Sequence, residues 1–473
     1  MKTDSYDLIV IGSGPAGEKG AARAAYFGKR VALVERSAAH GGAVANTGVP
    51  GKAMRETALY LSGYRKRDLH GISMQYRGAL GVHEFLHRGL QVRDALDTWI
   101  QANLERHRVA VHRGIASFVD RHTVRVAART GTTTITGDVV LIATGSRPLA
   151  LRDVPPGQPG IYDSDSILRM TTVPRSLIVI GGGAIGCEYA CLFQVLEVAV
   201  TVVDAGGVLL PTADREISAA LRASMEALGV AFRTPQRVVR IGRGADPTVH
   251  LESGEVLAAE AILVAVGRRG NVEELALERA GVAVDDRGLI QVNDAFQTSA
   301  VNVYAAGDVI GGPLLASIAM EQARMAVGNA FDLDRRSRAA TPLPLGVWTI
   351  PEVSMVGETE ERLREQGRSY VVGRARYDSN PRGVLIGEDR GLLKLLFSVP
   401  GRRLLGVHIV GEQACELIAP GLIALTMGAT TDTFIDACFN YPTLSDLYKY
   451  AAYDALGRLD RGELGGGPPR GSG

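Results

Sequence analysis

The chain is poor in cysteine and carries almost no net charge. Its 473 residues include only four cysteines, Cys187, Cys191, Cys415 and Cys438, and none of them forms a C-x-x-C pair. This spacing argues against a structural zinc site or a thioredoxin-like motif, so we expect no bound metal. With a net charge of +1, the chain also lacks the basic excess of proteins that bind nucleic acid or anionic membranes.

Long hydrophobic runs are absent as well. No apolar run reaches the ~18 residues that a membrane-spanning helix needs, and residues 1–4 lead into an apolar strand pattern without the features of a signal peptide. We therefore expect a cytoplasmic protein with no membrane partner. Hydrophobic residues make up 46% and charged residues 22% of the chain, which is typical of a globular fold. At ~150 residues per domain, the length predicts about three domains.

A glycine-rich motif occurs twice, each time directly after an apolar run. The runs Leu8–Ile11 and Leu177–Ile180 precede Gly12-Ser13-Gly14-Pro15-Ala16-Gly17 and Gly181-Gly182-Gly183-Ala184-Ile185-Gly186, respectively. The first glycine permits a tight turn from strand to helix, the second lets the backbone approach a pyrophosphate, and the third lets the helix pack closely on the strand. The N-terminus of the helix then offers free N–H groups to the phosphates.

An acidic residue closes the next apolar run in both halves. Glu35 follows Val31–Val34 and Asp204 follows Val200–Val203, each 18 residues after the last glycine of its motif. Such an acid accepts hydrogen bonds from ribose hydroxyls. An ordinary glycine-rich turn would explain one such motif. It would not explain why an apolar strand, the motif and an acid recur together at the same spacing. We therefore expect two dinucleotide sites and electron transfer between two dinucleotides.

Each motif is followed by a returning apolar strand that ends in glycine, and a third such strand comes later. Thr144-Gly145-Ser146 follows residues 139–143, Gly267 follows 261–266, and Gly307-Asp308 follows 301–306. We expect these strand ends to bring backbone against a nucleotide, and Asp308 to bind a sugar or polyol hydroxyl. A turn or helix-capping Asp is the alternative. From about residue 341, extended segments alternate with helices, which predicts an α+β domain.

Together these signatures resemble the flavoprotein disulfide reductases, a family that includes lipoamide dehydrogenase, glutathione and mercuric reductases and the soluble pyridine nucleotide transhydrogenases. The resemblance covers roughly residues 5–458 and is strongest for the transhydrogenases, whose F-N-Y-P-T run is similar to Phe439–Thr443. It implies an α/β fold with two Rossmann-like domains, for FAD and NAD(P), and a C-terminal α+β domain that forms a homodimer. The expected boundaries are 1–152 with 278–338 for the FAD domain, 153–277 for the NAD(P) domain, 339–458 for the interface domain and 459–473 for a flexible tail.

The resemblance also implies the residues that bind cofactors. They are Gly12, Gly14, Pro15, Ala16, Gly17, Glu35, Arg36, Gly42, Ala43, Lys52, Ala116, Thr144, Gly145, Ser146, Gly181, Gly183, Ala184, Ile185, Gly186, Glu188, Asp204, Val238, Gly267, Gly307, Asp308 and Ala316. In the family, the lysine that matches Lys52 lies by flavin N5 and pairs with the acid that matches Glu188. A cation there would favour the reduced, anionic flavin, whereas a solvated loop lysine is the alternative.

The redox dithiol of the family is missing. Its two cysteines belong to G-G-x-C-x-N-x-G-C-x-P-S-K, but residues 41–52 read GGAVANTGVPGK. The frame of Asn46, Gly48, Pro50 and Lys52 is kept, whereas the segment is one residue short and Val44 stands in place of the first cysteine. Because valine has no thiolate, neither a disulfide nor a charge-transfer thiolate can form beside the flavin.

The acid–base pair of the family is altered too. The disulfide reductases carry H-P-T-x-S-E, in which the histidine protonates a leaving thiol across the dimer interface, but residues 441–446 read YPTLSD. A tyrosine hydroxyl is a poor substitute for a base poised near neutrality. The joint loss indicates that thiol chemistry is not the function. Lys52, Glu188 and Tyr441 are the candidate catalytic residues.

The sequence thus favours an FAD-dependent enzyme that transfers hydride between NAD(P)H and NAD(P)⁺ with no redox disulfide. Asp204 favours the ribose of NAD(H), and Ala205-Gly206-Gly207 supplies no arginine for a 2′-phosphate, so NADP(H) binding rests on the resemblance alone. An NAD(P)H dehydrogenase that reduces quinones, dyes or O₂ is one alternative. A degenerate homologue kept for binding is another, because both thiols and the Ser of P-S-K are lost.

Overall fold

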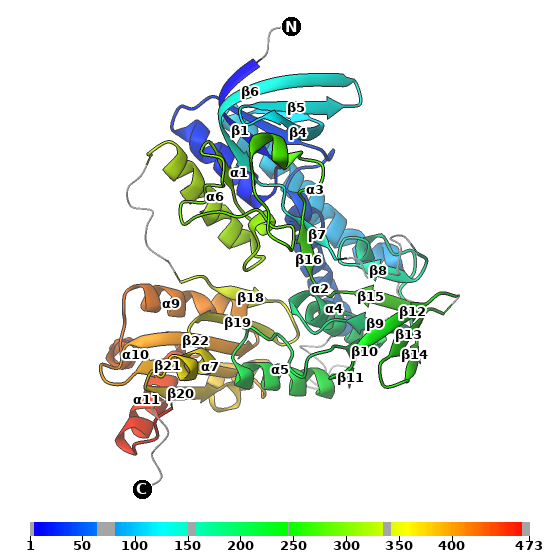
Figure 1. Ribbon diagram of the computed structural model, residues 1–473. Helices are drawn as coiled ribbons and strands as arrows, with labels where there is room; N and C mark the ends of the chain where they lie inside the picture. Colours follow the sequence, from blue (N-terminus) through cyan, green and yellow to red (C-terminus); the bar gives the residue numbers. More distant parts are fainter. Residues whose placement is uncertain (1–3, 64–80, 150–157, 245, 334–341, 466–473) are drawn as a thin grey trace.

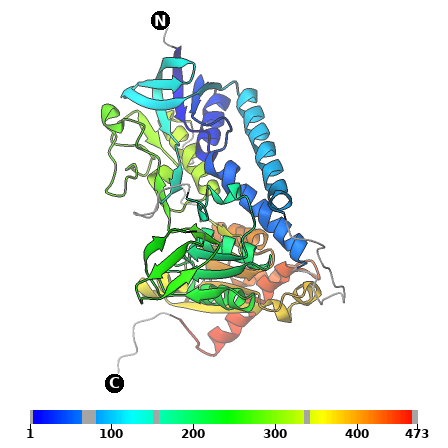
Figure 2. The same ribbon diagram turned by 90° about the vertical axis from the view of Figure 1, so that its right-hand side faces the viewer.

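The molecule consists of three units, each built around a β-sheet, as Figure 1 shows. The unit that contains β1 (Asp4–Ile11) occupies one end. The units that contain β9 (Ser176–Ile180) and β22 (Leu404–Gly411) lie side by side at the other end, as Figure 2 also shows. The computed structural model describes residues 4–63, 81–149, 158–244, 246–333 and 342–465.

The first unit is a seven-stranded sheet in the order β3-β2-β1-β6-β5-β4, with β17 also pairing with β6. Its central strand is apolar on both faces, because Leu8–Ile11 are 4% exposed or less, as expected for a parallel strand covered on two sides. Helices α1 (Pro15–Tyr26) and α6 (Ala316–Ala330) pack against each other on one face. The other strands are β2 (Val31–Glu35), β3 (Ala110–Arg113), β4 (Ile115–Asp120), β5 (Thr123–Ala128), β6 (Gly131–Ile142) and β17 (Val303–Ala305).

The second unit repeats the central part of the first. Its sheet has the order β11-β10-β9-β15-β8, in which β11-β10-β9-β15 corresponds to β3-β2-β1-β6. The register repeats as well: Ile11 pairs with Val34 and Ile142, and Ile180 pairs with Val203 and Val264. The elements are β8 (Ile161–Asp163), β10 (Ala199–Val203), β11 (Ala231–Arg233), β15 (Ala261–Val264), α4 (Ala184–Gln194) and α5 (Arg215–Ala227), with a side sheet of β12 (Val238–Gly242), β13 (Thr248–Leu251) and β14 (Val256–Ala258).

The third unit is an antiparallel sheet in the order β18-β19-β22-β21-β20. Its apolar residues form a core with α9, α10 and α11. The elements are β18 (Leu345–Val347), β19 (Glu352–Gly357), β20 (Tyr370–Arg376), β21 (Leu392–Ser398), α7 (Glu360–Glu365), α8 (Pro381–Ile386), α9 (Ala414–Thr426), α10 (Thr431–Asp436) and α11 (Leu447–Asp460).

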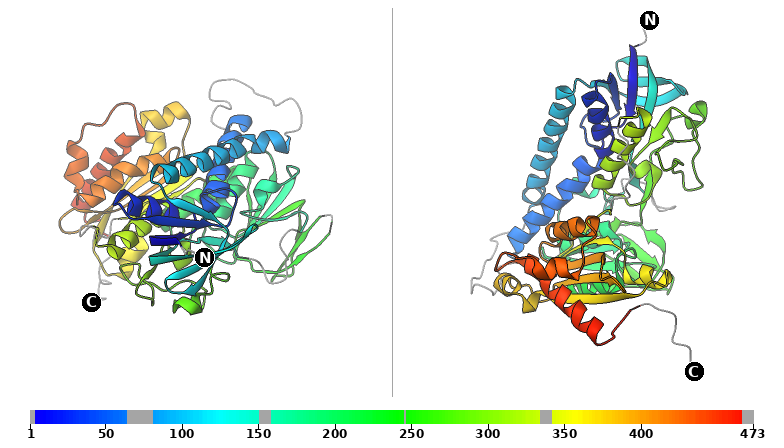
Figure 3. Two further views of the ribbon diagram at one scale, coloured as in Figure 1. Left: turned by 90° about the horizontal axis from the view of Figure 1, so that it is seen from above. Right: turned by 90° about the vertical axis from the view of Figure 1, so that its left-hand side faces the viewer.

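Two helices connect the units. α2 (Val49–Ser62) packs against the long α3 (Val82–Arg106), and Figure 3 shows α3 running along one side of the molecule from the first sheet toward the other two. Met54 of α2 and Phe85 of α3 belong to one hydrophobic cluster with Phe193 of the second unit and Val353 of the third. This shared core fixes the helices at the junction of all three units.

Residues 278–333 return to the first sheet through β17, and the short strands β7 (Ser146–Pro148) and β16 (Arg268–Gly270) pair across the first two units. The expected domain boundaries remain predictions, and residues 150–157 and 466–473 lie outside the described residues. Of the residues expected to belong to a flexible tail, 459 and 460 complete α11, and Gly465 forms a backbone pair with Tyr370. Within the described ranges, no helix is long and apolar enough to cross a bilayer.

Candidate functional site

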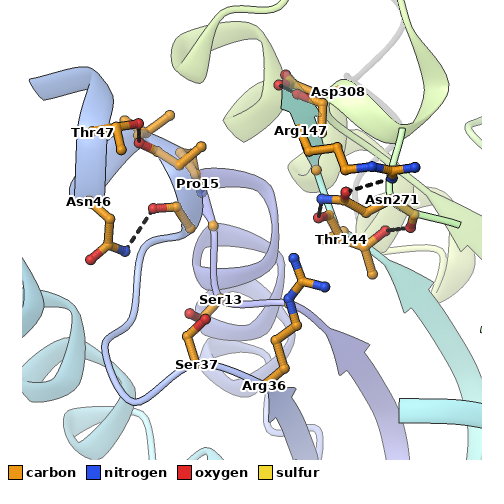
Figure 4. Close-up of a pocket in the computed structure, with 18 of the residues that line it drawn as sticks. Ser13, Pro15, Arg36, Ser37, Asn46, Thr47, Thr144, Arg147, Asn271 and Asp308 are labelled. Atoms are coloured by element: carbon orange, nitrogen blue, oxygen red, sulfur yellow. Dashed lines mark hydrogen bonds between the residues drawn. The ribbon is translucent and has the colours of Figure 1, made fainter. Parts of the chain in front are cut away.

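A cavity of about 930 Å³ lies where the carboxyl ends of the first sheet meet α2 and α3. This volume is near the upper end of the about 300–1,000 Å³ typical of ligand sites. Figure 4 shows Asn46 and Thr47 on one side of the cavity and Thr144 and Asp308 on the other. The expected cofactor-binding residues on its wall are Gly12, Gly14, Pro15, Ala16, Glu35, Arg36, Gly42, Ala43, Ala116, Thr144, Gly145, Ser146, Gly307, Asp308 and Ala316.

The first glycine turn is shaped to receive a large group. Gly12 has φ 102°, and a Cβ at this position would lie 2.5 Å from the Ala143 carbonyl oxygen; a Cβ at Gly17 would lie 1.8 Å from the Gly12 oxygen. Gly14, by contrast, has nothing within 4 Å of such an atom. No side chain caps α1 at Gly14. The turn therefore presents open space and the N-terminus of a helix, which together fit a pyrophosphate.

The second turn has the same construction. A Cβ at Gly181 would lie 2.3 Å from the Ala265 oxygen, and one at Gly186 would lie 1.9 Å from the Gly181 oxygen, whereas Gly183 has nothing within 4 Å. Gly183 is the N-cap of α4, again with no side-chain cap. The expected residues Ala184 and Ile185 begin this helix, Gly267 lies just beyond β15, and Val238 begins β12. These residues belong to the second unit and do not line the first cavity.

The two predicted ribose acids accept matching hydrogen bonds. Glu35 Oε2 accepts from the Ser13 backbone N–H at 2.9 Å, and Asp204 Oδ2 accepts from the Gly182 N–H at 2.7 Å. The other oxygen of each acid accepts from the residue two positions later, Ser37 N–H at 2.7 Å for Glu35 and Gly206 N–H at 2.6 Å for Asp204. Each carboxylate is thereby fixed beside its own glycine turn, and its remaining lone pairs can accept from ribose hydroxyls.

Contacts from the second unit hold the returning strand of the first. Thr144 Oγ1 donates to the Asn271 carbonyl at 2.7 Å, and Asn271 Nδ2 donates to the Thr144 carbonyl at 2.9 Å. Ser146 Oγ donates to Asp308 Oδ2 at 2.6 Å and accepts from Arg268 Nε at 2.8 Å. Neither Arg268 nor Asn271 was assigned a role from the sequence. The structure shows that they stabilise one edge of the cavity.

The cysteine-free segment forms a π-helical turn over Val44–Gly48 that continues directly into α2. Asn46 Nδ2 donates to the His40 and Gly42 carbonyls at 3.0 and 2.8 Å, and Thr47 Oγ1 donates to the Ala43 carbonyl at 2.7 Å. π-Helical turns are rare and are frequent at functional sites. The shortened segment is therefore ordered by its own polar side chains. Val44, which stands in place of the family's first redox cysteine, lies on the cavity wall.

Lys52 and Glu188 are brought together beside the cavity. Lys52 Nζ lies 2.9 Å from Glu188 Oε2, and Glu188 Oε1 accepts from the backbone N–H of Trp348 at 2.9 Å. Lys52 itself is not on the wall, although Pro50 and Met54 of the same helix are. Trp348 was not predicted from the sequence, because no motif identifies an aromatic residue from the third unit at this place.

Tyr441 lies apart from these groups. It is 73% exposed on the third unit and does not line the cavity. The described protomer thus separates Tyr441 from Lys52 and Glu188.

The four cysteines are free and lie away from the cavity wall. Cys187 and Cys191 are fully buried on α4. Burial raises the pKa of Cys187, and it raises the pKa of Cys191 to about 12. Neither thiol is ionised near neutral pH, so neither supplies a redox thiolate.

Comparison with known proteins agrees with this arrangement. Residues 6–323 match the pyridine nucleotide-disulphide oxidoreductase family, and residues 343–452 match its dimerisation domain. A soluble pyridine nucleotide transhydrogenase of Mycobacterium tuberculosis is 41% identical over 459 residues, covering 96% of this chain and 98% of the relative. One from Pseudomonas putida is 38% identical over 468 residues, covering 97% of this chain and 100% of the relative.

Two solved structures share the fold. LpdA from Mycobacterium tuberculosis has a TM-score of 0.88 and 26% identity, covering 95% of this chain and 99% of that one. The HOCl-induced flavoprotein disulfide reductase RclA from Escherichia coli, solved as a Cu(II) complex, has a TM-score of 0.84 and 29% identity, covering 96% and 99%. The chain therefore belongs to the pyridine nucleotide-disulphide oxidoreductase family of FAD-dependent enzymes.

Proposed function

We propose that this protein is a flavin-dependent transhydrogenase that passes hydride between NAD(H) and NADP(H) without a redox disulfide. One observation carries the proposal: two glycine turns hold their acids with the same hydrogen bonds, while the cavity beside the first turn contains no cysteine. Two dinucleotide sites with no thiol between them suit direct exchange through a flavin. The full-length similarity to soluble transhydrogenases supports the same reaction.

In this proposal the first cavity binds FAD, which supplies the two-electron store. The N-terminus of α1 binds the pyrophosphate, Glu35 accepts from the ribose, and Asp308 accepts from the flavin side chain. The α2–α3 pair and Val44 are proposed to exclude water from the flavin face, since Val44, Met54 and Leu86 line this part of the cavity. The protein contributes position and exclusion of water rather than a nucleophile.

Lys52 is the proposed catalytic cation. Its ion pair with Glu188 would hold the ammonium group toward the flavin, where a positive charge stabilises the reduced, anionic form. Glu188 belongs to α4 of the second unit and also accepts a hydrogen bond from the Trp348 backbone N–H. The pair therefore joins both nucleotide-binding units at the place where their cofactors must meet.

The second site is proposed to bind NAD(H) through Gly181–Gly186 and Asp204. A carboxylate at the end of β10 accepts from a 2′-hydroxyl and repels a 2′-phosphate. NADP(H) is the proposed partner nucleotide because the relatives are named pyridine nucleotide transhydrogenases. No basic residue directly follows Asp204. Tyr441 is proposed to reach the flavin site of the partner subunit in a homodimer, which the dimerisation-domain match supports.

The test compares electron acceptors. The purified FAD protein should reduce thio-NAD⁺ with NADPH faster than it reduces quinones with either nucleotide. Rapid quinone reduction without exchange between nucleotides would replace the proposal with a quinone-reducing NAD(P)H dehydrogenase. A colourless protein that cannot be reconstituted with FAD would indicate a degenerate homologue.

A further inference from the structure

A fully buried lysine joins the second and third units. Lys394 of β21 is 0% exposed, and its Nζ lies 2.8 Å from Asp214 Oδ1, 2.9 Å from Glu216 Oε2 and 2.5 Å from Glu360 Oε1. Asp214 and Glu216 belong to the start of α5, and Figure 1 shows α5 beside the sheet of the third unit. Arg374 of β20 adds a second cation, whose Nε donates to Glu216 at 2.7 Å. Three carboxylates from two units thus surround Lys394, and Arg374 pairs with one of them.

The three carboxylates lie within 4.8 Å of one another, but the ammonium group of Lys394 already occupies the centre of the group. Burial acts to lower the pKa of Lys394, yet the adjacent Asp214, Glu360 and Glu216 outweigh it and raise this pKa above its ordinary value. The lysine is therefore charged at neutral pH. Removing it would leave buried carboxylates without a counter-charge, which is costly in a protein interior.

Asp214 connects this cluster to the second nucleotide site. It is the N-cap of α5, where its Oδ1 accepts from the Glu216 N–H at 3.1 Å, and it ends the loop that begins at Asp204. Within that loop, the Leu210 N–H donates to the Gly182 carbonyl at 2.9 Å. The Gly182 N–H in turn donates to Asp204 Oδ2 at 2.7 Å. Asp214 follows Ala213, whose N–H donates to the Leu210 carbonyl at 2.7 Å, so the chain and its hydrogen bonds together link Lys394 to the glycine turn and its acid.

We propose that Lys394 is a positioning residue for the nicotinamide nucleotide: from the interface unit it holds the 204–214 loop against the second glycine turn. The inference rests on the proposed binding of NAD(H) at that turn. It assigns the third unit a role in nucleotide affinity that is separate from dimer formation. Lys394 acts through Asp214 and does not touch the nucleotide.

The experiment measures NADH binding to the FAD-loaded protein and needs no electron acceptor. In Lys394→Met, we expect the dissociation constant of NADH to rise about tenfold, which corresponds to about 1.4 kcal/mol, with FAD content and the rate at saturating NADH unchanged. Asp214→Asn tests the same contact more gently, because Asn caps a helix as well as Asp does and only the charge is removed. It should weaken NADH binding in the same direction.

Two further variants serve as controls for the change in NADH affinity. Arg402→Met removes a cation from an exposed ion pair of the same unit, with Asp432 at 3.0 Å, and should bind NADH as the wild type does. The double variant Lys394→Met/Asp214→Asn should bind NADH no more weakly than Lys394→Met alone, because both changes remove the same Lys394–Asp214 ion pair. Wild-type affinity in FAD-loaded Lys394→Met overturns the inference, and if that variant does not retain FAD, wild-type affinity in Asp214→Asn overturns it. Absence of NADH binding by the wild type would instead refute the proposed function.

Discussion

Lys52 Nζ lies 5.0 Å from the centroid of the Trp348 ring, so an aromatic side chain of the third unit covers the lysine that pairs with Glu188. A cation over an aromatic face is attracted by the negative face of the ring. The ammonium group is therefore held by a carboxylate from the second unit and a ring from the third. This arrangement fixes a positive charge next to the cavity without a contact from the first sheet itself.

Replacing Lys52 with Met should slow flavin reduction by NADH about tenfold or more, because each ~1.4 kcal/mol lost from the transition state reduces a rate tenfold. Stopped-flow absorbance of the flavin measures this rate. Lys29→Met is a matched control, since Lys29 also lies over an aromatic ring, Phe331, at 4.8 Å but away from the cavity. A wild-type rate in Lys52→Met would show that the lysine is structural.

Replacing Asp204 with Ala should raise the affinity for NADP(H) relative to NAD(H) by about tenfold. The substitution removes a charge that repels a 2′-phosphate and an acceptor for a 2′-hydroxyl. Equilibrium titration of the FAD protein with both nucleotides provides the ratio. An unchanged preference would mean that Asp204 does not face the ribose.

Thiol reagents should leave NADH:dye activity intact. Burial raises the pKa of Cys191 to about 12, and no cysteine lines the cavity, so alkylation should stop at the exposed Cys438. Activity after treatment with iodoacetamide or arsenite, together with the mass of the modified protein, checks this. Reduction of lipoamide or glutathione disulfide by the purified enzyme would contradict it.

Acid should weaken the protein partly through Glu273. Hydrogen bonds from Arg147 lower the pKa of Glu273 to about 2, from an ordinary 4.5. A carboxyl group with a lowered folded-state pKa stabilises the fold above its ordinary pKa, and the effect disappears as the pH falls from 4.5 to about 2. Because Glu273 is half-exposed, the gain is below about 1 kcal/mol. Thermal unfolding should therefore show Glu273→Gln less stable than wild type at neutral pH, and the difference should vanish near pH 2.

Sedimentation should report twice the chain mass of 50.2 kDa. The third unit exposes large apolar side chains, including Ile423, Met427 and Tyr450, and such groups are expected to be covered in an isologous interface. A change of Met427 to Glu should then shift the equilibrium toward the monomer. A monomeric wild type would rule out the proposed role of Tyr441 across subunits.

Both dinucleotide-binding units could be predicted from the sequence, because strand, turn and acid follow one another within a short stretch and each residue type has a local steric or charge reason. The alternation of extended segments and helices expected from about residue 341 is found in the third unit, where β21 and β22 are followed by α9. The Lys394 cluster was not predictable, since Lys394 and Asp214 are 180 residues apart and no local pattern marks either of them. Trp348 was missed for the same reason: its role comes only from the packing of three units.

Glu35 accepts a backbone N–H from the first glycine turn, and Asp204 accepts one from the second. The position of each acid is therefore fixed by a hydrogen bond within its own unit. The chain thus contains the same arrangement of glycine turn and acid twice. Exchange of residues 204–207 alone should therefore alter coenzyme choice, while Glu188 keeps its pairing with Lys52 beside the first cavity.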